Sequence, residues 1–168
     1  ESDEVKIISH NIIYQLIEDL EKWREEVRKK EEEKELLDLI RPSKVKYLRG
    51  CTFRQSNPAV IGVEILMGTL KSNSDLVKEN GDIVGNIKTI QYEKESVKEA
   101  EKGKQVALSI PGITAGRQIK EEEIFYTDMN ENNFKKLKVL KKFLTPEEIT
   151  VLKELAEIKR RANNLWGV

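Results

Sequence analysis

Between Val45 and Asp128, hydrophobic and polar residues alternate in short runs that end at glycine, asparagine or aspartate. The runs are KVKYLRGCTF, AVIGVEILMGTLK, GDIVGNIKTIQY, KQVALSIPG and EEIFYTD. They are rich in Val, Ile, Leu, Phe and Tyr, and turn residues recur roughly every 8–12 positions, which is typical of a small all-β barrel or sandwich. We therefore predict a β-barrel over residues 44–128.

The stretch before the barrel has helical spacing. Its apolar stripe consists of Ile13, Leu16, Ile17, Leu20, Trp23 and Val27. Every residue from Arg28 to Glu35 is charged, and Pro42 ends the pattern. Because no glycine or proline interrupts it, we predict one helix from about Asn11 to Ile40, capped by Asn11 or Ser9, with a solvated middle. Two shorter helices joined by a charged loop are the alternative, and the run Val5 to Ile8 is predicted to be a strand.

Residues 130–164 show two further helical patterns. Asn130 or Asn132 can open the first, and Thr145-Pro146 starts the second, with Glu148 at the capping-box position. So short a connection between two helices favours antiparallel packing. The predicted fold class is thus α+β: a long helix, a β-barrel and a C-terminal helix pair packed on the barrel.

Composition narrows the function classes. Charged residues make up 36% of the chain but the formal net charge is zero, so bulk charge does not point to nucleic acid. Residues 129–168 nevertheless carry a local excess of Lys and Arg over Glu. No run approaches the roughly 20 apolar residues that span a membrane, and the single cysteine fits a reducing compartment. We expect a cytoplasmic monomer that does not contact membranes and is a piece of a longer protein.

Candidate catalytic chemistry is sparse. The sequence has no G-x-x-x-x-G-K-[ST] phosphate loop, and one histidine with one cysteine cannot supply a nitrogen–sulfur metal site. His10 is interpreted as a packed or capping residue, Cys51 as a small buried hydrophobe, and Glu121 to Glu123 as a solvated hairpin. We therefore expect this chain not to be an enzyme.

Several segments together resemble one family. Residues 57–70 (NPAVIGVEILMGTL), 81–87 (GDIVGNI) and 97–108 (VKEAEKGKQVAL) follow the order of the second-domain barrel of translational GTPases. The match extends to VKIISHNIIYQLIEDLEKW near the start, to FRQSNP at 53–58 and to the closing AEIKRRANNLWG. Nearly the whole chain is thus similar to the C-terminal part of the archaeal translation initiation factor 5B family, relatives of bacterial initiation factor two.

The resemblance implies an arrangement and a role. Residues 1–15 would be the tail of the third domain, 11–41 the connecting helix, and 44–128 with 130–164 the fourth domain. The family's full protein is a ribosome-dependent GTPase that promotes subunit joining, and its GTP and Mg would bind outside this chain, which itself would need no cofactor. The barrel would contact the acceptor end of initiator methionyl-tRNA, and the helix pair would bind the C-terminal tail of initiation factor 1A. The alternative is a structural lever that relays GTPase state to the ribosome with little affinity of its own.

The resemblance also suggests residues for the tRNA contact. The positions matching the family's pocket are Val63, the run Gln91 to Lys94, and the run Gln105 to Ala107. The candidates chosen from them are Val63, Tyr92, Lys94, Gln105, Val106 and Ala107, and the flanking cations are Arg54 and Arg117. Only Tyr92 and Lys94 keep the family's chemical character. This departure removes groups that recognise a formylated amino group, which agrees with the unformylated methionine of archaeal initiator tRNA.

For the helix pair, we expect a groove that accepts an acidic, amphipathic peptide. The apolar candidates are Phe134, Leu137, Leu140, Leu144, Ile149, Leu152, Leu155 and Ile158, more than one shared seam requires. The candidate rim consists of Lys138, Lys141, Lys142, Lys153 and Lys159. Apolar anchors would give affinity and charge would give association rate. The alternative is that all the apolar residues dock on the barrel and the lysines are only solvated.

Overall fold

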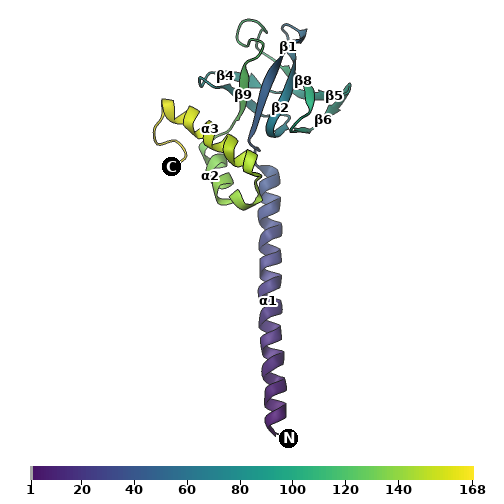
Figure 1. Cartoon of the computed structure of the whole chain (residues 1–168), viewed down its shortest axis with the longest axis vertical. Coiled ribbons are helices and arrows are strands. Elements are labelled where there is room, and N and C mark those ends of the chain that lie inside the picture. Colours follow the sequence, from purple (N-terminus) through teal and green to yellow (C-terminus); the bar gives the residue numbers. More distant parts are fainter. Residues whose placement is uncertain (1) are drawn as a thin grey trace. The chain divides into compact units, whose positions relative to one another are not determined.

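The computed structural model describes the backbone of residues 2–168 and the side chains of residues 12–168. It divides into two compact units, one ending at Asp38 and the other comprising Leu39–Val168. Figure 1 colours the elements in their order along the chain.

The first unit is a single helix, α1 (Ser2–Asp38). It is unbroken across the charged stretch 28–35, in agreement with one helix rather than two. The strand predicted at Val5 to Ile8 and the cap predicted at Ser9 or Asn11 are wrong, because the helix already begins at Ser2. A strand needs a neighbouring strand for its backbone groups, whereas a helix pairs its own N–H and C=O groups. All side chains from Ile12 to Glu26 are exposed, including five members of the apolar stripe, whereas Val27 at its end is half-buried.

The second unit contains a curled antiparallel sheet (Figure 1). The described residues contribute nine strands to it. These are β1 (Ser43–Arg54), β2 (Ala59–Lys71), β3 (Asp75–Lys78), β4 (Ile83–Asn86), β5 (Thr89–Tyr92), β6 (Glu95–Val97), β7 (Glu99–Glu101), β8 (Gln105–Ile110) and β9 (Ile124–Asp128). The order is β4-β3-β9-β1-β2-β8-β5-β6, with β7 also paired to β2. The long strands β1 and β2 lie at its centre and form the hairpin on which the other strands assemble.

The run GDIVGNIKTIQY forms two strands, although its sequence alternates without a marked break. Ile87 and Lys88 separate β4, at one end of the strand order, from β5, which is next to the strand at the other end. The Ile87 N–H donates to Ser74 O (2.8 Å), and the Lys88 N–H donates to Ser109 O (2.8 Å). Since Ser74 adjoins β3 and Ser109 belongs to β8, these two residues link the two halves of the sheet and curl it into a half-barrel.

The concave side of the sheet holds the core. Its fully buried members include Val45, Tyr47, Ile61, Val63, Ile65, Leu70, Leu76, Ile90, Leu108, Ile110 and Phe125. They follow the two-residue period of the strands, so that each strand gives one face to this cluster. Burial of each large apolar side chain stabilises the fold by about 1.5–3 kcal/mol.

The C-terminal helices are α2 (Glu131–Val139) and α3 (Pro146–Ala162), joined by the single 3₁₀ turn η1 (Lys141–Phe143). The predicted caps are confirmed: Asn130 accepts from the Asn133 N–H, and Thr145 accepts from the Glu148 N–H (3.2 Å). The helix α3 packs on β1, β2 and β9. The predicted α+β fold, with a long helix, a curled sheet and two C-terminal helices, is therefore confirmed.

The contact between α3 and the sheet includes charged pairs. Lys44 Nζ lies 3.2 Å from Glu154 Oε2, and Lys159 Nζ lies 2.5 Å from Asp128 Oδ1. Burial, followed by a hydrogen bond with Glu154, raises the pKa of Tyr126 above its usual range. The phenol therefore stays neutral and can donate to the Glu154 carboxylate at this seam.

Candidate binding surfaces

An open cleft of about 410 Å³ lies on the outer side of the sheet. We call it the barrel cleft. Its lining residues come from β1, β2, β8 and the β5–β6 turn: Leu48, Cys51, Phe53, Val60, Gly62, Gln91, Glu93, Lys94, Gln105, Val106 and Ala107. Most of the floor is apolar, and Lys94 is its one cation among these lining residues. The cleft can therefore take an apolar group with a polar or anionic neighbour.

Close approach of β1 and β2 forms the floor of the barrel cleft. A Cβ atom at Gly62 would lie only 2.6 Å from Cys51 Cβ, so this position requires glycine. Cys51 is partly exposed rather than buried as predicted, because β1 is bulged between Tyr47 and Thr52 and again before Arg54. Phe53 beside it is 68% exposed and presents an aromatic face to solvent.

The turn between β5 and β6 places the cation of the cleft. Tyr92 pairs with Glu95, so Glu93 and Lys94 form a two-residue hairpin loop. Both have positive φ, 51° and 69°, a conformation that asparagine and glycine adopt most easily. A strained turn without glycine therefore holds Lys94 at the edge of the cleft.

Four of the residues suggested for tRNA contact do line the cleft, namely Lys94, Gln105, Val106 and Ala107. Val63 does not, because its side chain is fully buried in the core. It shares the inward face of β2 with Ile61 and Ile65, while Val60 and Gly62 share the outward face. In a strand, successive side chains point to opposite faces. The alternation along β2 therefore shows from the sequence which of its residues point outward.

The remaining three lie elsewhere. The Tyr92 ring packs against the core, with Lys104 Nζ 5.2 Å from its centroid. Arg54 is exposed on β1 and its Nε donates to Ser56 O (3.1 Å). Arg117 is exposed in the turn after Thr114. None of these three lines the barrel cleft.

A second hollow of about 390 Å³ lies between α2 and α3. We call it the helix-pair groove. Its lining residues are Phe134, Lys138, Lys141, Ile149, Leu152, Lys153, Ala156, Glu157 and Arg160. Four cations thus surround an apolar floor that carries a single carboxylate, which gives the groove a positive rim.

The structure divides the predicted helix-pair residues into two sets. Phe134, Lys138, Lys141, Ile149, Leu152 and Lys153 line the groove. Leu137, Leu140, Leu144, Leu155 and Ile158 are buried, and they hold the second unit together rather than line the groove. Lys159 pairs with Asp128, and Lys142 lies over the Phe143 ring. Arg160, which the sequence did not single out, completes the rim because it lies one turn after Ala156 and Glu157 on the same helix.

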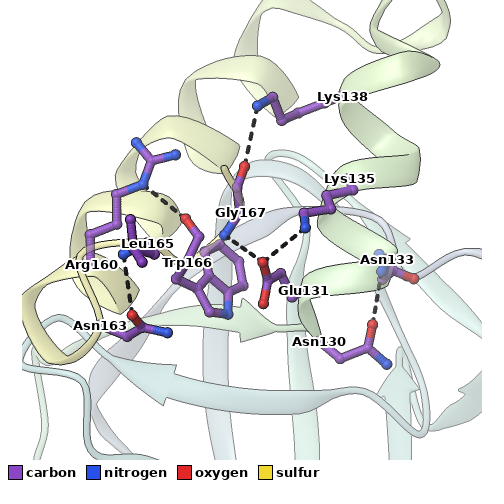
Figure 2. Close-up of polar contacts among 10 residues, drawn as sticks. All are labelled: Asn130, Glu131, Asn133, Lys135, Lys138, Arg160, Asn163, Leu165, Trp166 and Gly167. Atoms are coloured by element: carbon purple, nitrogen blue, oxygen red, sulfur yellow. Dashed lines mark hydrogen bonds and ion pairs between the residues drawn. The ribbon is translucent and has the colours of Figure 1, made fainter.

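The last residues of the chain fold back beside the groove (Figure 2). The Trp166 and Phe134 ring centroids are 4.6 Å apart. Arg160 Nε donates to Trp166 O (3.0 Å), and Lys138 Nζ donates to Gly167 O (3.2 Å). The Gly167 N–H donates to Glu131 Oε1 (3.2 Å), and Lys135, followed by this N–H, lowers the pKa of Glu131. Two cations of the groove are thus held by backbone carbonyl groups.

Comparison with known proteins decides the family. A family model for elongation factor Tu domain 4 matches residues 41–126, about half of the chain. The chain belongs to this family. A probable translation initiation factor IF-2 of Methanocella arvoryzae is 44% identical over 99% of this chain. A probable translation initiation factor IF-2 of Ignicoccus hospitalis is 44% identical over 100% of this chain. The chain spans 28% of each of these relatives.

A solved structure agrees with these matches. GDP-bound aIF5B from Aeropyrum pernix has a TM-score of 0.78 and 38% sequence identity over 92% of this chain, which covers 26% of that chain. The resemblance to the C-terminal part of archaeal initiation factor 5B, inferred from the motifs, is thereby confirmed. This elongation factor Tu domain 4 family member carries its two hollows on different parts of the second unit.

Within residues 2–168, no helix combines the length and the hydropathy that crossing a bilayer requires. Among the described side chains, those of residues 12–168, the His, Cys, Asp and Glu residues do not form a group of three or more placed to hold a metal ion.

Proposed function

We propose that this chain is the C-terminal binding region of a translation initiation factor that promotes ribosomal subunit joining. In this proposal the helix-pair groove binds the C-terminal tail of initiation factor 1A, and the barrel cleft contacts the acceptor end of initiator methionyl-tRNA. GTP and Mg would bind to the GTPase domain of the parent protein, since this chain has no phosphate loop. The relatives named as initiation factors support the role in initiation.

The rim of the helix-pair groove carries the first part of the proposal. Lys138, Lys141, Lys153 and Arg160 surround a floor that includes Phe134, Ile149 and Leu152. An acidic peptide with two or three apolar side chains complements both features, because its anchors bury apolar area and its carboxylates meet the cations. The groove carries four cations and one carboxylate. A nucleic acid backbone would favour a longer row of cations, so the charge of the groove fits a peptide better.

Isothermal titration of the chain with the initiation factor 1A tail peptide tests this proposal. Ile149 is half-buried and lines the groove, so Ile149→Asp should abolish binding while the fold persists. Val139→Asp is the matched control, since Val139 is 79% exposed on α2 and does not line the groove. Unchanged binding by Ile149→Asp would exclude the groove as the site.

The charges should act mainly on the rate of association. Lys141→Glu combined with Lys153→Glu is expected to slow association about tenfold and to flatten its salt dependence. Lys120→Glu combined with Lys88→Glu makes the same change in charge at exposed positions outside the groove. Equal slowing by both pairs would attribute the effect to net charge alone.

The gathering of Lys94, Gln105, Val106 and Ala107 around one apolar cleft supports the tRNA contact. The exposed Phe53 ring offers a stacking face, and Lys94 offers one phosphate contact. We expect Phe53→Ala with Lys94→Ala to weaken binding of charged initiator tRNA about tenfold, whereas Arg54→Ala with Arg117→Ala should weaken it less. If Arg54→Ala with Arg117→Ala weakened tRNA binding more than Phe53→Ala with Lys94→Ala, the contact would lie at these flanking cations and not in the cleft.

A structural lever remains the alternative function, and one observation favours it. The Asn133 side chain accepts from the Ile40 N–H (3.0 Å) and donates to Ile40 O (3.1 Å), while Glu148 pairs with Arg41. Phe134 and Ile149, which follow Asn133 and Glu148 in the sequence, line the groove. The residues just before β1 are thus linked to both helices of the groove, as a lever would require. If the chain acts only as a lever, it should bind neither the tail peptide nor tRNA, and Asn133→Ala should impair ribosome-stimulated GTP hydrolysis by the full factor.

A further inference from the structure

The closing residues of the chain have contacts that the proposed function does not explain. The segment 163–167 turns back on itself, with the Trp166 N–H donating to Asn163 O (3.0 Å) and the Leu165 N–H donating to Asn163 Oδ1 (3.2 Å). Gly167 is buried, although it lies close to the end of the described chain. A segment held by this many contacts is built into the second unit (Figure 2).

Gly167 fits against Phe134 with no spare room. Its φ is +71°, and a Cβ atom there would lie 2.6 Å from Phe134 Cε1. The Trp166 ring covers the same phenylalanine with a centroid distance of 4.6 Å. The segment therefore fixes the ring that forms part of the groove floor.

The same two residues hold two of the four cations. The Trp166 carbonyl occupies only the Nε donor of Arg160, and the four N–H groups on its terminal nitrogens remain. The Gly167 carbonyl takes one of the three donors of Lys138, whose Nζ is 5.8 Å from the Phe134 centroid. A neutral carbonyl leaves both positive charges uncompensated while it restricts where they lie.

We propose that Trp166 and Gly167 are positioning residues that make one end of the helix-pair groove selective for a carboxylate. They do not touch the peptide; they hold Lys138 and Arg160 in place, so that a carboxylate meets an ordered pair of cations. Holding long side chains in advance removes the conformational entropy that binding would otherwise cost. This inference rests on the proposed binding of an acidic tail.

The test uses two peptides and four variants of the full chain, one of which is a control. One peptide is the initiation factor 1A tail, and the other is the same peptide with every Asp and Glu replaced by Asn and Gln. Gly167→Ala displaces the segment but keeps its carbonyl groups, and Trp166→Ala removes the ring contact while Trp166→Phe restores an aromatic face. Leu165→Ala is the control, because Leu165 is 74% exposed in the same segment.

We expect Gly167→Ala and Trp166→Ala to weaken the acidic peptide about tenfold and the neutral peptide less than twofold, since charge-assisted contacts are the ones lost. Trp166→Phe should recover most of the affinity, and Leu165→Ala should change the affinity for neither peptide.

Equal losses of affinity for both peptides, or no loss, would overturn the inference and leave the groove intact. Tighter binding by Gly167→Ala would also overturn it, because the segment would then be a competitor. Failure of the unaltered chain to bind either peptide would instead refute the proposed function, and the inference with it.

Discussion

At the scale of single residues, Arg41 and Glu148 form a largely buried ion pair within the second unit. Both oxygens of Glu148 lie 2.7 Å from Arg41 Nη2, and the two side chains are 19% and 3% exposed. Glu148 stands at the capping-box position of α3, where its carboxylate would ordinarily reach the Thr145 N–H. It binds Arg41 instead, so the start of α3 is tied to the residues just before β1.

Removal of one partner should therefore be costly. Glu148→Ala leaves the guanidinium without its carboxylate, and we expect the free energy of unfolding to fall by about 3 kcal/mol. Urea denaturation, followed by the fluorescence of the second unit, measures this change in the free energy of unfolding. Arg41→Met with Glu148→Leu should recover much of the loss, since two apolar side chains need no compensation. Lys102→Ala, which breaks an ion pair with Glu147 that is largely exposed, should cost less than about 1 kcal/mol. Similar losses of stability from Glu148→Ala and Lys102→Ala would contradict this ranking.

Glu131 gives the closing segment a dependence on pH. Hydrogen bonds from Lys135 and from the Gly167 N–H lower the pKa of Glu131 below the ordinary glutamate value of 4.5. A carboxyl group whose pKa is lowered by folding stabilises the folded arrangement above pH 4.5, and this contribution is lost as the pH falls through the lowered pKa. We expect the Gly167 amide resonance to titrate with a midpoint below 4.5. Glu131→Gln should remove this titration, and its persistence in that variant would assign it to another group.

At the scale of elements, the sequence pattern was informative where a strand or helix buries one continuous face. The span of β2, both caps of the C-terminal helices and the uninterrupted charged stretch of α1 follow from local signals. The pattern was misleading where tertiary contacts decide. Nothing in GDIVGNIKTIQY shows that Ile87 bonds to one half of the sheet and Lys88 to the other. The placement of Val63 was carried over from the family's pocket, and the alternation along β2 argues against it.

The β5–β6 turn was missed for a different reason. Its two central residues are Glu93 and Lys94, which are not among the residues that mark a two-residue hairpin. Since both have positive φ, Lys94→Gly should raise the free energy of unfolding by about 0.5–1 kcal/mol. The same variant should weaken tRNA binding if Lys94 serves the barrel cleft, so that stability and binding change in opposite directions. Chemical denaturation and filter binding measure the two effects, and destabilisation by Lys94→Gly would show that the turn is unstrained.

At the scale of the whole molecule, the two units are stabilised in different ways. The second unit has a core of buried aliphatic and aromatic residues that joins strands distant in sequence. In α1, every side chain from Ile12 to Glu26 is exposed, including Leu16 at 63% and Trp23 at 60%. A helix without such a core depends on its own hydrogen bonds and on pairs of side chains along its surface, which contribute little each. Cooperative unfolding of both units as one is therefore not expected.

The chain's two tryptophans allow this to be measured, because Trp23 belongs to α1 and Trp166 to the second unit. In the variant Trp23→Phe, the fluorescence reports only the second unit, while circular dichroism at 222 nm reports mainly α1. We expect the dichroism to decline gradually from low temperature, before a sharp fluorescence transition at higher temperature.

Amide exchange should agree, with low protection between residues 12 and 30 and high protection in β2 and β8, because local opening is most frequent where packing is sparse. A chain that begins at Leu39 should keep the fluorescence midpoint within a few degrees. Coincident transitions in the two signals would show instead that α1 draws its stability from the second unit.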